Sequence, residues 1–223
     1  MTSPNGQRVL LRCTALLLFV FLAACGGATP AATPGGDAQS HLDQGRQYME
    51  QGKLSEAVTE FQTAVQIDSN SVEAHFRLGS AYIDQGKPDV AVQELQKAIA
   101  LDAENADALH NLGAAYYQLA QFDRAEAELG RALRLHPNDA DTHYMLGATY
   151  VQQSKLDAGI SEFLEALRLN PDLAEPYFGL GNAYKLQGKK AEAIAALEKF
   201  LTVNKDAQLK QLSDSLLTEL KGQ

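Results

Sequence analysis

The chain has 223 residues, of which 45% are hydrophobic, and a formal net charge of −9 at pH 7. This apolar content is sufficient for a buried core and predicts a folded protein. The acidic balance disfavours a nucleic acid as the partner. Both cysteines, Cys13 and Cys25, lie close to the N-terminus, which excludes a disulfide framework in the rest of the chain.

The first 24 residues have the layout of an export signal. Arg8 and Arg12 precede an apolar run from Thr14 to Ala24, and no acidic residue occurs before Gly26. The run is shorter than the roughly 20 apolar residues that a helix needs to span a bilayer. An uncleaved transmembrane anchor is therefore the weaker alternative.

This segment ends in Leu22-Ala23-Ala24-Cys25-Gly26, which resembles the lipobox of bacterial lipoproteins. The resemblance implies that Cys25 is lipidated and becomes the first residue of the mature chain. An ordinary secretory signal cleaved after Ala24 is the alternative. Gly26, where aspartate would favour retention, argues by the same resemblance against an inner-membrane location. The expected localisation is the bacterial cell envelope, with the protein lipid-anchored to a membrane and facing outside the cytoplasm.

Residues 25–37 are predicted to be the lipidated cysteine and a flexible linker. Residues 26–37 contain four glycines, two prolines and no large apolar side chain, a composition that cannot form a core. Twelve flexible residues reach roughly 20 Å. Without residues 1–24 the chain has 17 Lys and Arg residues against 28 Asp and Glu residues, so the lipid has to provide the attachment to an anionic membrane.

From residue 38 onward the sequence repeats with a period of 34 residues. In each unit a glycine is followed three residues later by a tyrosine, and then by a small residue, a large apolar residue and a second small or aromatic residue. The glycines are Gly45, Gly79, Gly113, Gly147 and Gly181, and the tyrosines are Tyr48, Tyr82, Tyr116, Tyr150 and Tyr184. Each unit is predicted to form two antiparallel helices, with the glycine where their backbones approach closely.

The stretch that begins Leu112-Gly113-Ala114-Ala115-Tyr116 and ends at Pro137 resembles the tetratricopeptide repeat. The resemblance implies an all-α protein, a right-handed α-solenoid of five helix-turn-helix repeats with a C-terminal capping helix. The expected repeats span residues 38–71, 72–105, 106–139, 140–173 and 174–207, and the capping helix spans residues 208–223.

The capping helix is predicted from the last repeat. Phe200 stands where the other repeats have a small alanine, so its neighbour is not expected to be another repeat. The final segment has leucines at helical spacing. They are Leu209, Leu212, Leu216 and Leu220.

The first helix of each repeat is expected to line a concave surface, on which the resemblance places the fifth residue of each repeat. These rings and their neighbours suit a peptide from another protein, because rings provide contact area at low entropic cost. The predicted groove residues are Phe76, His110, Tyr144, Phe178, Tyr117, Arg77, Asn111, Asn182 and Lys185. For each ring the alternative is ordinary packing, and for each polar residue it is plain solvated surface.

No metal site, cofactor or catalytic residue is predicted. His41, His75 and His143 share one repeat position, but equivalent residues of neighbouring repeats lie about 8–10 Å apart, whereas metal donors lie about 2 Å from their ion. Core histidines are the better interpretation. Acidic residues at the turns between repeats are interpreted as helix caps. They are Asp102, Glu104, Asp139 and Asp141.

The sequence thus predicts a non-enzymatic scaffold for protein–protein interaction, anchored to the cell envelope, that binds a peptide or protein in its groove. In layout it resembles the repeat lipoproteins that assist pilus, secretin or outer-membrane assembly. A lipoprotein that binds a glycan or cell-wall fragment in the same groove is the alternative, because aromatic ladders also stack on sugars. An enzyme is a more distant third.

Overall fold

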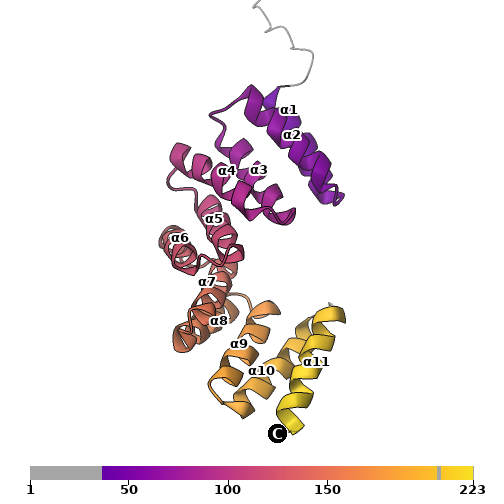
Figure 1. Ribbon diagram of the computed structural model, residues 1–223, viewed down its shortest axis with the longest axis vertical. Coiled ribbons are helices and arrows are strands. Elements are labelled where there is room, and N and C mark those ends of the chain that lie inside the picture. The colour runs from indigo at the N-terminus through magenta and orange to yellow at the C-terminus, as the bar shows by residue number, and fades with distance from the viewer. Residues whose placement is uncertain (1–36, 205–206, 223) are drawn as a thin grey trace, which may run out of the picture.

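The computed structural model describes residues 37–204 and 207–222, without the side chains of residues 205–209. The predicted export signal, Cys25 and the predicted linker up to residue 36 lie outside the described residues. The described chain is a stack of helices that follow one another in chain order (Figure 1). The helices are α1 (Ala38–Glu50), α2 (Leu54–Ile67), α3 (Val72–Asp84), α4 (Pro88–Leu101), α5 (Ala106–Gln118), α6 (Phe122–Leu135), α7 (Ala140–Gln152), α8 (Leu156–Leu169), α9 (Glu175–Leu186), α10 (Lys190–Val203) and α11 (Ala207–Gly222).

The helices pack in a regular order that makes the stack a solenoid. Each odd-numbered helix from α1 to α9 packs most extensively against the next helix in the chain, and each of these pairs packs against the following pair. The odd-numbered helices also contact one another from α1 to α9, whereas no two even-numbered helices pack to a similar extent. The odd-numbered helices therefore form the inner wall of the curved stack. The predicted all-α solenoid is confirmed.

The glycine of each repeat permits the close approach of its two helices. An added Cβ atom at Gly79 would lie 2.6 Å from Cγ of Leu95, and one at Gly147 would lie 2.7 Å from Cδ1 of Phe163. Both large side chains are almost fully buried. The glycine thus makes the space that the large apolar residue of the second helix fills.

The turns within the repeats use a left-handed residue. Gly52, Gly86 and Gly188 have φ near +70°, the conformation that glycine adopts at the end of a helix without steric cost. The same position is held by Ala120 with φ +55° and by Ser154 with φ +63°. These two repeats thus use residues that bear a Cβ atom in a conformation that favours glycine.

Side chains at the turns between repeats cap some of the inner helices. Ser71 Oγ accepts a hydrogen bond from the Ala74 amide, and Asn105 Oδ1 accepts one from Ala108. Such bonds satisfy N–H groups that have no partner within the helix. Asp139 is the N-cap residue of α7, as predicted, but its side chain makes no bond to the helix backbone and instead accepts a hydrogen bond from the hydroxyl of Thr142.

Helix α11 covers the end of the solenoid by packing against α10 (Figure 1). Leu217 and Leu220 are only 7% and 4% exposed and cluster with Leu197 of α10. Leu216 is half-buried, but Leu212 is 48% exposed. The prediction that Leu212 belongs to the buried face is therefore wrong, because α11 turns Ser213 and Leu217 toward the repeats instead. The side chain of Leu209 lies outside the described part.

Candidate partner-binding groove

Five of the predicted groove residues line one hollow on the inner wall. They are Tyr117, Tyr144, Phe178, Asn182 and Lys185. The hollow has a volume of about 460 Å³ and lies across α5, α7 and α9. Ala148, Val151, Phe163 and Leu186 add to its apolar lining, and Gln152 and Glu175 add polar groups at its margin. We refer to it as the apolar hollow.

The rings of the apolar hollow are held from behind by rings of the core. The centroid of Tyr144 lies 6.0 Å from that of Phe163, and the centroid of Phe178 lies 5.4 Å from that of Phe200. Both core phenylalanines are 1% exposed, whereas Tyr144 and Phe178 are half-buried. Each groove ring therefore has one part fixed in the core and another part available to a partner, an arrangement that limits the entropy lost on binding.

The hydroxyl of Tyr144 is kept neutral by its surroundings. Burial raises the pKa of Tyr144 to about 12, and the negative charge of Glu175 acts in the same direction. The group therefore keeps its proton at neutral pH and can donate a hydrogen bond.

A second, smaller hollow adjoins the first and shares Tyr144 and Glu175 with it. It has a volume of about 280 Å³. We refer to it as the acidic hollow, because its lining includes two carboxylates and no Lys or Arg. The lining residues are His110, Asp141, Tyr144, Met145, Leu173, Glu175 and Pro176.

His110 is tied to the turn between the third and fourth repeats. Its Nδ1 lies 2.7 Å from Oγ1 of Thr142, and this hydroxyl donates to Asp139. Because the hydroxyl proton goes to the carboxylate, Nδ1 of His110 donates to Thr142. Burial lowers the pKa of His110, although Asp139, Asp141 and Asp107 oppose the shift. The imidazole is therefore neutral at neutral pH.

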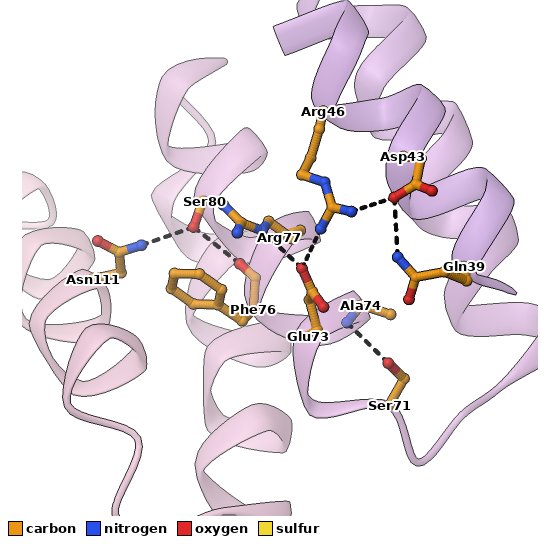
Figure 2. A network of polar contacts seen from close by, with 10 residues as sticks. All are labelled: Gln39, Asp43, Arg46, Ser71, Glu73, Ala74, Phe76, Arg77, Ser80 and Asn111. Carbon is orange, nitrogen blue, oxygen red and sulfur yellow. Dashed lines mark hydrogen bonds and ion pairs between the residues drawn. The ribbon is translucent and has the colours of Figure 1, made fainter. Parts of the chain in front are cut away.

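The remaining predicted residues, Phe76, Arg77 and Asn111, lie toward the N-terminal end of the groove, near Arg46 of α1 (Figure 2). Arg46 pairs with Asp43 and, across to α3, with Glu73, where Nη1 and Oε1 are 2.5 Å apart. Nε of Arg77 lies 3.4 Å from the same oxygen of Glu73. Both guanidinium groups thus already have carboxylate partners.

Two further predicted residues belong to this N-terminal group. Asn111 donates a hydrogen bond of 2.7 Å to Oγ of Ser80, and the guanidinium of Arg77 lies 5.4 Å from the ring centroid of Phe76. Phe76 lines none of the hollows described above. The structure therefore divides the nine predicted residues into six that line the two hollows over α5, α7 and α9 and three, Phe76, Arg77 and Asn111, that lie on α3 and α5 toward the N-terminal end of the groove.

Lys185 and Asn182 differ in their surroundings, although both lie on α9. Nζ of Lys185 lies 2.7 Å from Oε2 of Glu219 on α11, so the capping helix supplies its counter-charge. The Asn182 side chain has no hydrogen-bond partner among residues 37–204 and 207–222. Of the polar residues predicted for the groove, Asn182 is thus the one that is most available to a partner.

Asp141 and Glu175 were not predicted as groove residues. Both hold the second position of their repeats, and each lies in the first turn of an inner helix. Their place at the second position of the repeat could have identified them, because the resemblance to the tetratricopeptide repeat assigns positions to the concave wall, as it did for the fifth position.

The histidines at the fourth repeat position each pair with a glutamate of the following helix. Nδ1 lies 2.6 Å from Glu60 in His41, 2.7 Å from Glu94 in His75 and 2.6 Å from Glu162 in His143. These pairs join the two helices of a repeat. In the described part of the chain no group of three or more His, Cys, Asp or Glu side chains is placed to hold a metal ion.

A stack of paired helices with a concave wall defines a helical-repeat protein of the solenoid class. The chain matches family models described as TPR repeat over residues 45–86, 79–120 and 147–188 and as tetratricopeptide repeat over residues 106–139 and 174–206. The chain therefore belongs to the tetratricopeptide-repeat family, whose members bind protein or peptide partners.

Solved structures share this fold. MamA protein is 28% identical with a TM-score of 0.64, and the match covers 74% of this chain and 90% of that chain. PilF of Pseudomonas aeruginosa is 22% identical with a TM-score of 0.71, and the match covers 83% and 84%. YrrB, described as a TPR protein with an unusual peptide-binding site, is 23% identical with a TM-score of 0.63, and the match covers 80% and 92%. No curated protein matches the chain.

Within the described helices, none is both long enough and apolar enough to cross a membrane.

Proposed function

We propose that this protein is a scaffold of the bacterial cell envelope that binds an extended or helical segment of a partner protein in its concave groove. The observation that carries the proposal is the apolar hollow, in which half-buried rings of Tyr144 and Phe178 lie on the inner wall and are fixed from behind by Phe163 and Phe200. Rings in this position provide a large contact area at low entropic cost. The role proposed is binding rather than catalysis.

A peptide suits the groove better than a glycan does. A sugar that stacks on rings also needs polar groups around it to bond its hydroxyls. On this wall Asn111 bonds to Ser80 and Lys185 pairs with Glu219. These two polar groups are thus already engaged within the protein, whereas the rings of Tyr144 and Phe178 remain available for the broad apolar contact that a peptide side chain makes. The peptide-binding site in the description of YrrB lends further support.

We further propose that the folded body is attached to a membrane by lipid on Cys25. The support is the lipobox resemblance of residues 22–26 and the linker composition of residues 26–37. Metabolic labelling with a palmitate analogue tests this attachment. The wild type is expected to be labelled and the Cys25→Ser variant is not, whereas the Cys13→Ser control is expected to be labelled normally. Label that persists in Cys25→Ser would contradict the anchor.

Cross-linking and pull-down from native membranes tests the groove. A Tyr144→Ala/Phe178→Ala variant is expected to lose a partner that the wild type captures. The matched control is Tyr150→Ala/Tyr177→Ala, which also removes two rings but from residues that line neither groove hollow. Circular dichroism of all three proteins verifies that the helices persist. Equal capture by the two double variants would contradict binding in the groove.

A further inference from the structure

The two hollows over α5, α7 and α9 form one composite surface. The apolar hollow and the acidic hollow share Tyr144 and Glu175 in their linings. Leu186, which is 66% exposed, lies in the lining of the apolar hollow. A segment bound along the groove would therefore place neighbouring side chains in two different environments: one with two carboxylates, Asp141 and Glu175, and one lined mainly by apolar side chains, with Glu175 at the boundary.

The negative charge at this surface is uncompensated. Asp141 and Glu175 line the acidic hollow, and the charge of Asp107 acts on His110. All three carboxylates lie in the first turn of their helix, and in the described part of the chain none of them forms an ion pair. They contrast with Glu73 at the other end of the groove, which pairs with two arginines. The acidic groups near Tyr144 are thus available to a charge supplied from outside.

The inner wall offers no free cation that would attract an acidic partner. Helices α5 and α7 contain no Lys or Arg at all. The cations of the other three inner helices are Arg46, Arg77 and Lys185, and each is paired with a carboxylate. His110 does not supply a positive charge at neutral pH, because burial lowers its pKa.

Resting on the groove binding proposed above, we infer that the partner segment carries a Lys or Arg side chain close to a large apolar side chain. The cation occupies the acidic hollow beside Asp141 and Glu175, next to the ring of Tyr144, whose face attracts cations. The apolar side chain occupies the apolar hollow against Phe178 and Leu186. Charge complementarity of this kind selects the partner and fixes its register.

The linker of this chain does not have that chemistry. Residues 25–37 contain no Lys or Arg and no large apolar side chain. The linker is therefore not the occupant, and the inference commits to a segment of a different protein.

Selection of random peptides of roughly 12 residues on phage, against the full-length chain, tests the inference with defined probes. The recovered peptides are expected to combine Lys or Arg with Phe, Leu, Tyr or Ile within a few residues. Their affinity, measured by fluorescence polarisation, is expected to fall about tenfold for Asp141→Asn/Glu175→Gln and to weaken with added salt.

The control variant is Asp89→Asn/Glu192→Gln. It removes the same charge from the first turns of two outer helices, α4 and α10, so it matches the loss of net charge and of helix-dipole stabilisation. It is expected to bind with unchanged affinity.

The other outcomes are decisive as well. Peptides without Lys or Arg that need Tyr144 and Phe178 but not the two carboxylates would overturn the inference and leave the groove proposal standing. Peptides that need neither pair of residues, or a selection that recovers no peptide, would overturn both.

Discussion

Leu129 of α6 occupies the space that a Cβ atom at Gly113 of α5 would need, since its Cγ lies only 2.6 Å from that position. The same relationship joins Gly79 to Leu95 and Gly181 to Leu197. The two helices of a repeat therefore approach as closely as they do because one has no side chain at the contact. The stability of each repeat should depend on this absence.

Gly113→Ala is expected to destabilise the protein by about 1–2 kcal/mol, because forcing a methyl group into a filled core costs more than the helix propensity that alanine gains. Urea unfolding measures the change. The control is Gly130→Ala on α6, where the nearest atom to an added Cβ lies 3.9 Å away. That substitution is expected to stabilise the protein by about 1 kcal/mol. Stabilisation by both changes would contradict the close-approach account.

The turns of the third and fourth repeats offer a second test. Ala120→Gly and Ser154→Gly are each expected to stabilise the protein by about 0.5–1 kcal/mol, because the left-handed conformation costs a residue with a Cβ atom more than glycine loses in entropy. Gly86→Ala, with φ +70° at the same position of the second repeat, is expected to have the opposite effect. Thermal unfolding compares the three variants, and a lower midpoint for both glycine substitutions would refute the prediction.

His110 is expected to make stability depend on pH. Burial lowers its pKa from 6.5, so just below pH 6.5 the unfolded chain binds a proton that the folded chain does not. The free energy of unfolding should therefore rise with pH through this window, and the contribution of neutral His110 is complete above it and lost as the pH falls.

Urea unfolding at about pH 7.5 and about pH 5.5 measures this dependence. His110→Asn, which keeps a donor for Thr142 but does not titrate, is expected to show a smaller difference between the two pH values. His136→Asn, which alters an exposed histidine at the end of α6, serves as the control. An unchanged difference in His110→Asn would show that His110 does not contribute.

The capping helix is expected to stabilise the last repeat through two leucines. Leu217→Ala and Leu220→Ala are each expected to cost about 2–3 kcal/mol, since both side chains are buried against the repeats. Leu212→Ala should cost less than about 0.5 kcal/mol because Leu212 is 48% exposed. Equal losses at positions 212 and 217 in urea unfolding would contradict the orientation of α11.

The repeat period of 34 residues was sufficient to predict the solenoid. In each of the five repeats the glycine of the first helix and the large apolar residue of the second helix define the same contact between the two helices. The orientation of α11 could not be predicted in the same way. Its leucines at positions 212, 216, 217 and 220 are compatible with two overlapping faces, and only contact with α10 selects the one that buries Leu217.

The rings of the groove were predicted from their place in the repeat, but their electrostatic surroundings were not. Whether Arg46 and Arg77 are available to a partner depends on Glu73, which lies between them on the folded wall. Whether Lys185 is available depends on Glu219, which is 34 residues further along the chain. Pairings of this kind arise only when the helices are stacked.

Site-specific photo-cross-linking in living cells tests the central claim, binding in the concave groove, most directly. Leu186 lines the apolar hollow, and Leu164 lies on the outer helix α8; both are exposed leucines, at 66% and 49%. A photoreactive residue at position 186 is expected to cross-link one envelope protein, and the same residue at position 164 is not. Cross-linking of the same partner from position 164 alone, or equally from both positions, would contradict binding in the groove.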